Sequence, residues 1–309
     1  MDYIQAGVEA LKTAYRVQEE LFKQGEISGK NIIGELVEKG SGSDKSLRGD
    51  WESEEAVIEV LRARGLPVRV IAEEHGTIDI VSNPNFLAVL DGYDGSSALA
   101  ANPGARGGTM LAIAKSLNPT YNEFVFGGLT ERASGVVVYG APRGDVYEFN
   151  MKNGKWNQLN PFQHQRRFGR NTRVHLDDPI LWEEHAEGVT SGLDEIGELM
   201  HETFTTPLKE HAILSGQNSS AAMCLDLLYG EVDAIGGVIA KGVFEPPAEY
   251  PMIRELGGIM LGIDGTEIGD KRWSEYGRPL SPLIRANSRL MGMGIVKFLE
   301  SLRNKPEKE

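Results

Sequence analysis

The chain is poor in cysteine and has no long apolar run. Cys224 is the single cysteine among 309 residues. One thiol cannot form an intrachain disulfide or supply a zinc cluster of cysteines. No segment reaches the roughly 18 uninterrupted apolar residues of a membrane span, and the first residues, MDYIQAGVEALKTAY, lack the apolar core of a signal peptide. We therefore expect a cytoplasmic protein with no membrane partner.

Basic residues are also in short supply. The chain has 32 Lys and Arg against 45 Asp and Glu, a formal net charge of −13. A surface this acidic repels the phosphate backbone of nucleic acids, so neither DNA nor RNA is an expected partner. A small phosphorylated ligand is not excluded, because bound cations can reverse the local field. Apolar residues make up 40% and charged residues 25%, the ordinary balance of a globular protein with a sizeable core.

Apolar periodicity predicts an α/β protein with mixed sheets in two parts. The polar stretch 150–173 places a boundary near its end, giving an N-terminal α+β domain at 1–170 and a C-terminal α/β domain at 171–309. In the first part, the pattern predicts helices at 2–24 and 51–64 and strands at 68–72, 86–90, 109–114, 124–127, 135–139 and 146–149. In the second part, it predicts helices at 193–200, 220–229, 249–256 and 295–303 and strands at 212–214, 234–235 and 259–263.

The central chemical feature is a pair of aspartates after the apolar run 86–90. Asp91 and Asp94 follow that run three residues apart, and Gly95, Ser96 and Ser97 come next. Carboxylates at a strand end can share hard cations, which prefer oxygen ligands. The Gly-Ser-Ser segment can expose backbone N–H groups and begin a helix, which suits a phosphate oxygen. The alternative is an Asx turn followed by an ordinary helix cap.

Further acids lie upstream and downstream. Glu73 and Glu74 end the strand predicted at 68–72, and Asp44 and Asp50 precede the helix predicted at 51–64. Glu245 follows an apolar pair and stands before a proline-containing first helical turn. Taken singly, each has a structural explanation: a cap for Asp50, a solvated turn for Glu73 and Glu74, and a helix-dipole acid for Glu245. Together they place carboxylates at the ends of several predicted strands, and this pattern favours a metal site.

These elements, in this order, resemble the inositol monophosphatase and fructose-1,6-bisphosphatase superfamily of Mg²⁺-dependent, lithium-sensitive phosphomonoesterases. Its Asp-Pro-Ile/Leu-Asp-Gly-Thr/Ser hallmark is matched by the segment 91–96, with Gly92 in place of the proline. Its Glu-Glu strand end is matched at 73–74, and its late metal carboxylate by Glu245 ahead of a Gly-Gly pair at 257–258. Its Gly-Ser-Ala-Ala helix is matched at 219–233, with Ser219 in place of the glycine.

The resemblance implies a layered α-β-α-β-α sandwich and a homodimer that hydrolyses a small phosphorylated substrate, a sugar or inositol phosphate. It implies two or three Mg²⁺ ions, with Mn²⁺ as a substitute, and Asp91 bridging two of them. The implied metal ligands are Glu73, Asp91, the Tyr93 carbonyl, Asp94 and Glu245. Asp50 and Ser96 would orient the attacking water and accept its proton, with Glu73 also catalytic. Gly95, Ser96, Ser97 and Lys241 would bind substrate, and Asp44 and Glu74 would support the metals.

Other residues have mainly structural interpretations. His75 is expected to be a turn residue, because Mg²⁺ avoids imidazole. Asp233 is expected to be structural, with some chance of touching substrate, and 163–170 to be a solvated loop or a subunit contact. Three alternatives stay open: an adenosine 3′,5′-bisphosphate nucleotidase of the same superfamily, a non-catalytic metal- or ligand-binding module, and a structural α/β protein in which the acids are caps.

Overall fold

The computed structural model describes residues 2–28, 47–102, 104–142, 145–162, 167–177, 206–208, 219–237, 244–273 and 283–303. The chain opens with two helices, α1 (Tyr3–Gln24) and α2 (Arg48–Ala63). Asp2 caps the start of α1, and Gly25 ends it with φ of 73°, a left-handed conformation that glycine adopts without strain. Among the residues that the structure describes, no helix combines the length and the apolar character needed to span a bilayer.

The larger sheet follows the two helices in sequence. Its strand order is β2-β1-β3-β4-β5-β6-β7-β8. β1 and β3 are parallel, and the remaining neighbours are antiparallel. The strands are β1 (Val68–Ala72), β2 (Gly76–Asp79), β3 (Phe86–Asp94), β4 (Gly108–Ala114), β5 (Phe124–Glu131), β6 (Val136–Ala141), β7 (Asp145–Asn150) and β8 (Trp156–Leu159).

The smaller sheet is also mixed. Its order is β11-β12-β10-β9, in which β9 and β10 are parallel and the other pairs antiparallel. The strands are β9 (Val174–Asp177), β10 (Ala234–Gly237), β11 (Ile259–Gly262) and β12 (Leu283–Ala286). The remaining helices are α3 (Ser96–Ala101), α6 (Thr206–Leu208), α7 (Ser220–Leu228), α8 (Glu245–Glu255) and α9 (Arg289–Arg303), with a 3₁₀ turn, η2, at Tyr121–Glu123.

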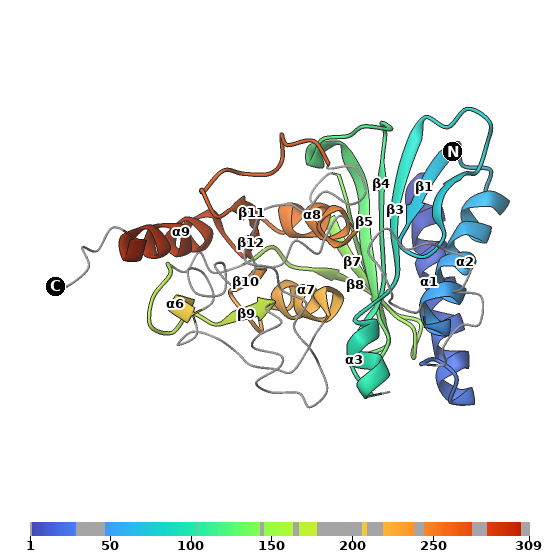
Figure 1. The fold of residues 1–309 in the computed structure, drawn as a ribbon, viewed down its shortest axis with the longest axis horizontal. Helices are drawn as coiled ribbons and strands as arrows, with labels where there is room; N and C mark the ends of the chain where they lie inside the picture. Colours follow the sequence, from blue (N-terminus) through green and yellow to red (C-terminus); the bar gives the residue numbers. More distant parts are fainter. Residues whose placement is uncertain are drawn as a thin grey trace.

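Helices and sheets alternate in five layers (Figure 1). Apolar residues of α1 and α2 pack on one face of the larger sheet, and α7 and α8 fill the space between the two sheets. On the far side of the smaller sheet, α9 packs through Met291, Ile295 and Leu299. The predicted fold class, mixed α/β sheets in an α-β-α-β-α sandwich, is confirmed.

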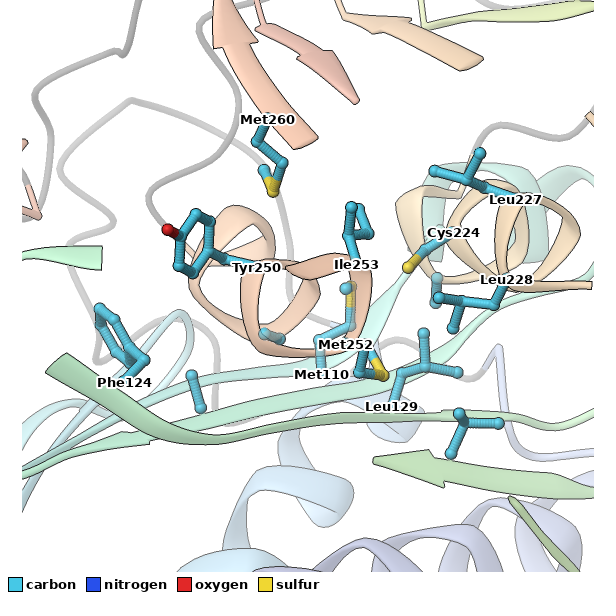
Figure 2. Close-up of a cluster of buried hydrophobic side chains, with 14 of the residues drawn as sticks. Met110, Phe124, Leu129, Cys224, Leu227, Leu228, Tyr250, Met252, Ile253 and Met260 are labelled. Atoms are coloured by element: carbon cyan, nitrogen blue, oxygen red, sulfur yellow. The ribbon is translucent and has the colours of Figure 1, made fainter. Parts of the chain in front are cut away.

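The middle layer contains the core that joins the two sheets. Figure 2 shows Met110 and Leu129 of the larger sheet beneath Met252 of α8 and Cys224 of α7. α8 approaches the sheet closely because glycine stands where it crosses: a Cβ at position 127 would lie 2.3 Å from the Ala248 carbonyl oxygen. Cys224 is fully buried among these side chains.

Several predicted boundaries were wrong. The strand predicted to stop at residue 90 continues to Asp94, because β4 goes on pairing with it. α8 begins at Glu245 rather than 249, since the prolines at 246 and 247 fall in the first turn, where a helix needs no backbone donor. α9 begins at Arg289 rather than 295, and β2, β8, β9 and β12 were not predicted. The helix predicted at 193–200 and the strand at 212–214 lie outside the described residues.

Candidate metal centre

Three buried carboxylates from distant parts of the chain meet between the larger sheet and α8. Asp91 and Asp94 lie on β3, and Glu245 is the first residue of α8. One oxygen from each of the three lies within 4.8 Å of the other two. All three side chains are buried, with exposed fractions of 4%, 8% and 7%. We refer to Asp91, Asp94 and Glu245 as the acid cluster.

A bulge in β3 brings the two aspartates together. Side chains alternate between the faces of a regular strand, so residues three apart point in opposite directions. Asp91 pairs with Met110 and Asp94 with Gly108, so three steps along β3 match two along β4. The extra residue of such a bulge interrupts the alternation of side chains, so that both carboxylates can point to the same face of the sheet. We refer to Asp91–Asp94 as the β3 bulge.

The start of α7 holds Asp94. The Ser219 hydroxyl donates to Asp94 Oδ2 at 2.6 Å, and the Ala221 N–H donates to the same oxygen at 2.7 Å. Ser219 is also the N-cap of α7 and accepts from the Ala222 N–H at 3.2 Å. Asp94 Oδ2 thus receives two donors from the start of α7, and these fix the position of its carboxylate. Gly95, with φ of 93°, lies against Ser219 so closely that a Cβ at position 95 would be 2.8 Å from Ser219 Cβ.

The electrostatics of the acid cluster suit a hard cation. Burial raises the pKa of Asp91 well above its usual value, and the negative charges of Glu73, Asp94, Glu245 and Asp50 raise it further. Asp91 Oδ1 is buried and has no hydrogen-bond partner within the described chain. A buried, unsatisfied carboxylate oxygen amid other acids is costly unless a cation compensates it. Oxygen-only donors match the preference of Mg²⁺, Mn²⁺ and Ca²⁺.

Two of the other predicted acids, Asp50 and Glu73, lie near Asp91. Asp50 is on α2 with 5% exposure, and Glu74 is 4% exposed. Glu73 leaves β1 with its N–H bonded to the Leu90 carbonyl at 3.2 Å, which places it beside the strand that carries Asp91. Asp50 and Glu73 both contribute to the raised pKa of Asp91. The structure therefore gathers acids that are far apart in the sequence.

The predicted substrate residues are only partly described. α3 begins at Ser96 directly after Gly95, as the Gly-Ser-Ser segment indicated. The Tyr93 phenol is buried beside Arg132 Nε at 3.4 Å, and burial raises its pKa to about 12. Asp44, Lys241 and the Ser97 side chain lie outside the described residues, so their predicted roles stay predictions.

Residues predicted to be structural have clear local contacts. His75 Nδ1 lies 2.8 Å from Glu54 Oε2, and its ring contacts Trp51 at an interplanar angle of 31° with centroids 3.9 Å apart. Asp233 accepts from the Arg173 N–H at 2.9 Å and from the Asn287 amide at 3.3 Å, and so joins β10 to neighbouring segments. Of the stretch 163–170, the structure describes only 167–170.

Three residues near the acid cluster were missed. Ser219 was noted only as a departure from the family pattern, although a serine before a helix is a recognisable cap. Glu54 follows Asp50 by four residues and therefore lies on the same helix face, a signal that the sequence did contain. Gln18 is a polar residue on the apolar face of α1, where it is fully buried.

Comparison with known proteins identifies the architecture. No protein-family model matches the chain, and no curated protein is significantly similar to it in sequence. Solved structures do match. Inositol monophosphatase II from Staphylococcus aureus is 13% identical with a TM-score of 0.67, over 97% of this chain and 94% of that chain.

Two further structures agree. An inositol monophosphatase (IMPase) from Thermotoga maritima is 16% identical with a TM-score of 0.62, over 98% of both chains. The fructose-1,6-bisphosphatase of Leishmania major in its holo form is 13% identical with a TM-score of 0.64, over 97% of this chain and 93% of that chain. Over nearly its whole length, the chain therefore has the fold of inositol monophosphatases and fructose-1,6-bisphosphatases.

Proposed function

We propose that this chain is a Mg²⁺-dependent phosphomonoesterase that hydrolyses a sugar or inositol phosphate. The observation that carries the proposal is the acid cluster, three buried carboxylates with oxygens within 4.8 Å of one another. A structural α/β protein gains nothing from burying three mutually repelling acids. The fold shared with inositol monophosphatases and a fructose-1,6-bisphosphatase supports the same conclusion.

The proposed metal ligands are the acid cluster together with Glu73 and the Tyr93 carbonyl. Bound divalent cations would neutralise the phosphate dianion and lower the pKa of a water molecule. Asp50, at the edge of the cluster on α2, would orient that water and accept its proton together with Ser96. The N–H groups of Gly95 and Ser96, where α3 begins, would donate to phosphoryl oxygens. Asp44 and Glu74 would support the ligands or a third ion.

The proposed substrates are fructose 1,6-bisphosphate and inositol 1-phosphate. An enzyme that takes most of its binding energy from cations and phosphate tolerates different alcohol portions, because those contacts ignore the leaving group. Lys241 is the proposed contact for a second phosphate, as a point charge on a flexible stem.

A phosphate-release screen with Mg²⁺ tests the proposal. The panel contains fructose 1,6-bisphosphate, inositol 1-phosphate and adenosine 3′,5′-bisphosphate. Release from the first two is expected. Release from the nucleotide alone would move the substrate assignment to a nucleotidase, and no release from any ester, despite metal binding, would point to a non-catalytic module.

A further inference from the structure

A buried glutamate lies behind the acid cluster on α2. Glu54 is one helical turn beyond Asp50 and has no exposed surface. Its carboxylate accepts from the Glu74 N–H at 3.0 Å and from the His75 N–H at 2.9 Å, and it lies 2.8 Å from His75 Nδ1. These bonds fix the turn Glu73–His75, which leaves β1 and carries two of the predicted metal-site acids.

The same side chain also lies against the β3 bulge. A Cβ on Gly92 would be 2.2 Å from the Asp50 carbonyl oxygen and 2.8 Å from Glu54 Cγ. The backbone of α2 therefore touches the bulge directly, between the two aspartates. Glu54 contacts both acid-bearing segments at once, one through hydrogen bonds and the other through packing.

A second polar side chain reaches the bulge from α1. Gln18 Nε2 donates to the Gly92 carbonyl at 3.2 Å, to Ser53 Oγ at 3.1 Å and to Thr109 Oγ1 at 2.8 Å. The Thr109 hydroxyl donates to the same Gly92 carbonyl at 2.8 Å. Gln18, Ser53 and Thr109 are all fully buried. The bulge is thus held from behind by a polar network that no solvent reaches.

Packing alone does not explain these groups. α1 and α2 already bury an apolar core against the larger sheet. An apolar residue in place of Gln18 or Glu54 could extend that core. Hydrogen bonds differ from apolar contacts in direction, since they fix where a backbone N–H or carbonyl points. Direction matters at the Glu73–His75 turn and the β3 bulge, because their acids repel one another before a cation arrives.

We propose that Gln18 and Glu54 are positioning residues that hold the β3 bulge and the Glu73–His75 turn in the geometry a divalent cation requires. This inference rests on the proposed function, because it takes the acid cluster to be a metal site. Neither residue is proposed to touch metal or substrate. Both act through the backbone of the segments that carry the ligands, and Glu54 also through the His75 ring.

The test compares Glu54→Gln and Gln18→Leu with wild type. The first keeps the shape but turns an amide NH₂ toward N–H donors. The second removes the Gln18 donor to the Gly92 carbonyl and leaves the donor from the Thr109 hydroxyl. Mn²⁺ binding is measured by calorimetry, well below the unfolding temperature of every variant. Removing groups that orient metal ligands typically weakens affinity about 10- to 100-fold. We expect a dissociation constant at least about 10-fold higher for Glu54→Gln and several-fold higher for Gln18→Leu.

A readout in the metal-free protein keeps the test independent of activity. Amide hydrogen exchange at Glu74 and His75 should accelerate in Glu54→Gln, because their acceptor is weakened. Leu61→Ala is the matched control, since Leu61 lies on the same helix, is fully buried in the same core and is apolar. It should lower the unfolding temperature and leave the Mn²⁺ affinity unchanged.

The outcomes separate this inference from the proposed function. Wild-type affinity in both variants would overturn the positioning role while leaving the metal site standing, as would an equal loss of affinity in Leu61→Ala. If wild type itself binds no Mn²⁺, the metal site and the positioning role fall together. If Glu54→Gln does not fold, Gln18→Leu decides the question, because it leaves the Glu54 bonds intact.

Discussion

Asp91 stands where burial and neighbouring charge act in the same direction. Burial, then Glu73, Asp94, Glu245 and Asp50, raise its pKa well above the usual value of 3.8. Between pH 3.8 and the raised native pKa, Asp91 therefore keeps its proton in the metal-free native state and loses it in the unfolded chain. Over this range, the free energy of unfolding falls as the pH rises. A carboxylate at this position destabilises the metal-free fold at neutral pH.

The variant Asp91→Asn should consequently stabilise the metal-free protein at pH 7. The amide has the shape of the carboxylate but no charge for burial and the neighbouring acids to disfavour. The same variant should lose at least ~10²-fold in phosphatase activity, because an amide cannot neutralise the cations that the site requires. Thermal unfolding in chelator at pH 4 and pH 7 tests the stability change. A wild-type protein more stable than the variant at pH 7 would contradict the assignment.

Gly92 is the position at which this chain departs from the proline of the family it resembles. The backbone here has room only for glycine, because a Cβ at position 92 would lie 2.2 Å from the Asp50 carbonyl oxygen. Gly92→Ala should therefore destabilise the protein by about 1–3 kcal/mol, the usual cost of overpacking a tight site. Gly169→Ala is the control, since the nearest atom to a Cβ there is 4.0 Å away. Equal unfolding midpoints for the two variants would show that α2 and the bulge can separate freely.

At the scale of elements, the acid cluster depends on how α7 and α8 begin. Glu245 opens α8, and the start of α7 donates twice to Asp94. Both helices lie between the sheets (Figure 1), and the first residues of each lie close to Asp94 of β3. Two helix starts and one irregular strand therefore build the cluster.

Ser219→Ala tests the contribution of α7. It removes the hydroxyl that donates to Asp94 at 2.6 Å and caps the helix at Ala222. Losing a cap and a buried hydrogen bond to a carboxylate should cost about 1–3 kcal/mol of stability, with weaker metal binding. Ser220→Ala, one residue along the helix, should change both quantities much less. Chemical unfolding and Mn²⁺ calorimetry on the two variants give the comparison, and equal losses would remove the special role of Ser219.

At the scale of the whole molecule, the family resemblance implied the layered fold, and the sequence predicted the site in part. Apolar periodicity located α1, α2 and most strands of the larger sheet, because their buried faces repeat at regular spacing. The short strands β9 and β12 were missed because a polar residue, His175 or Arg285, interrupts the apolar run of each. Chemistry at strand ends marked Asp91, Asp94 and Glu245 as candidates. Their convergence could not be predicted from the residues alone, because it depends on the β3 bulge and on the packing of α8 against the larger sheet.

Metal binding should also stabilise the molecule as a whole. A ligand that binds the native state alone adds about 2.7 kcal/mol when its concentration is 100 times the dissociation constant. Mg²⁺ or Mn²⁺ should therefore raise the unfolding temperature by several degrees, whereas Na⁺ at equal ionic strength should not. Asp91→Asn should lose this shift, because the negative charge at position 91 is gone. If divalent cations leave the unfolding temperature of the wild-type protein unchanged, the acid cluster does not bind them.

The central claim is tested most directly by measuring phosphate release from fructose 1,6-bisphosphate or inositol 1-phosphate. One sample is used throughout, before chelation, after chelation and after the cation is restored. The protein is assayed with Mg²⁺, then in excess EDTA, then after Mg²⁺ or Mn²⁺ is restored. We predict activity that disappears in EDTA and returns with the cation, and that is absent throughout in Asp91→Asn. Full turnover in excess EDTA would contradict the account, because the acid cluster would then have no part in the reaction.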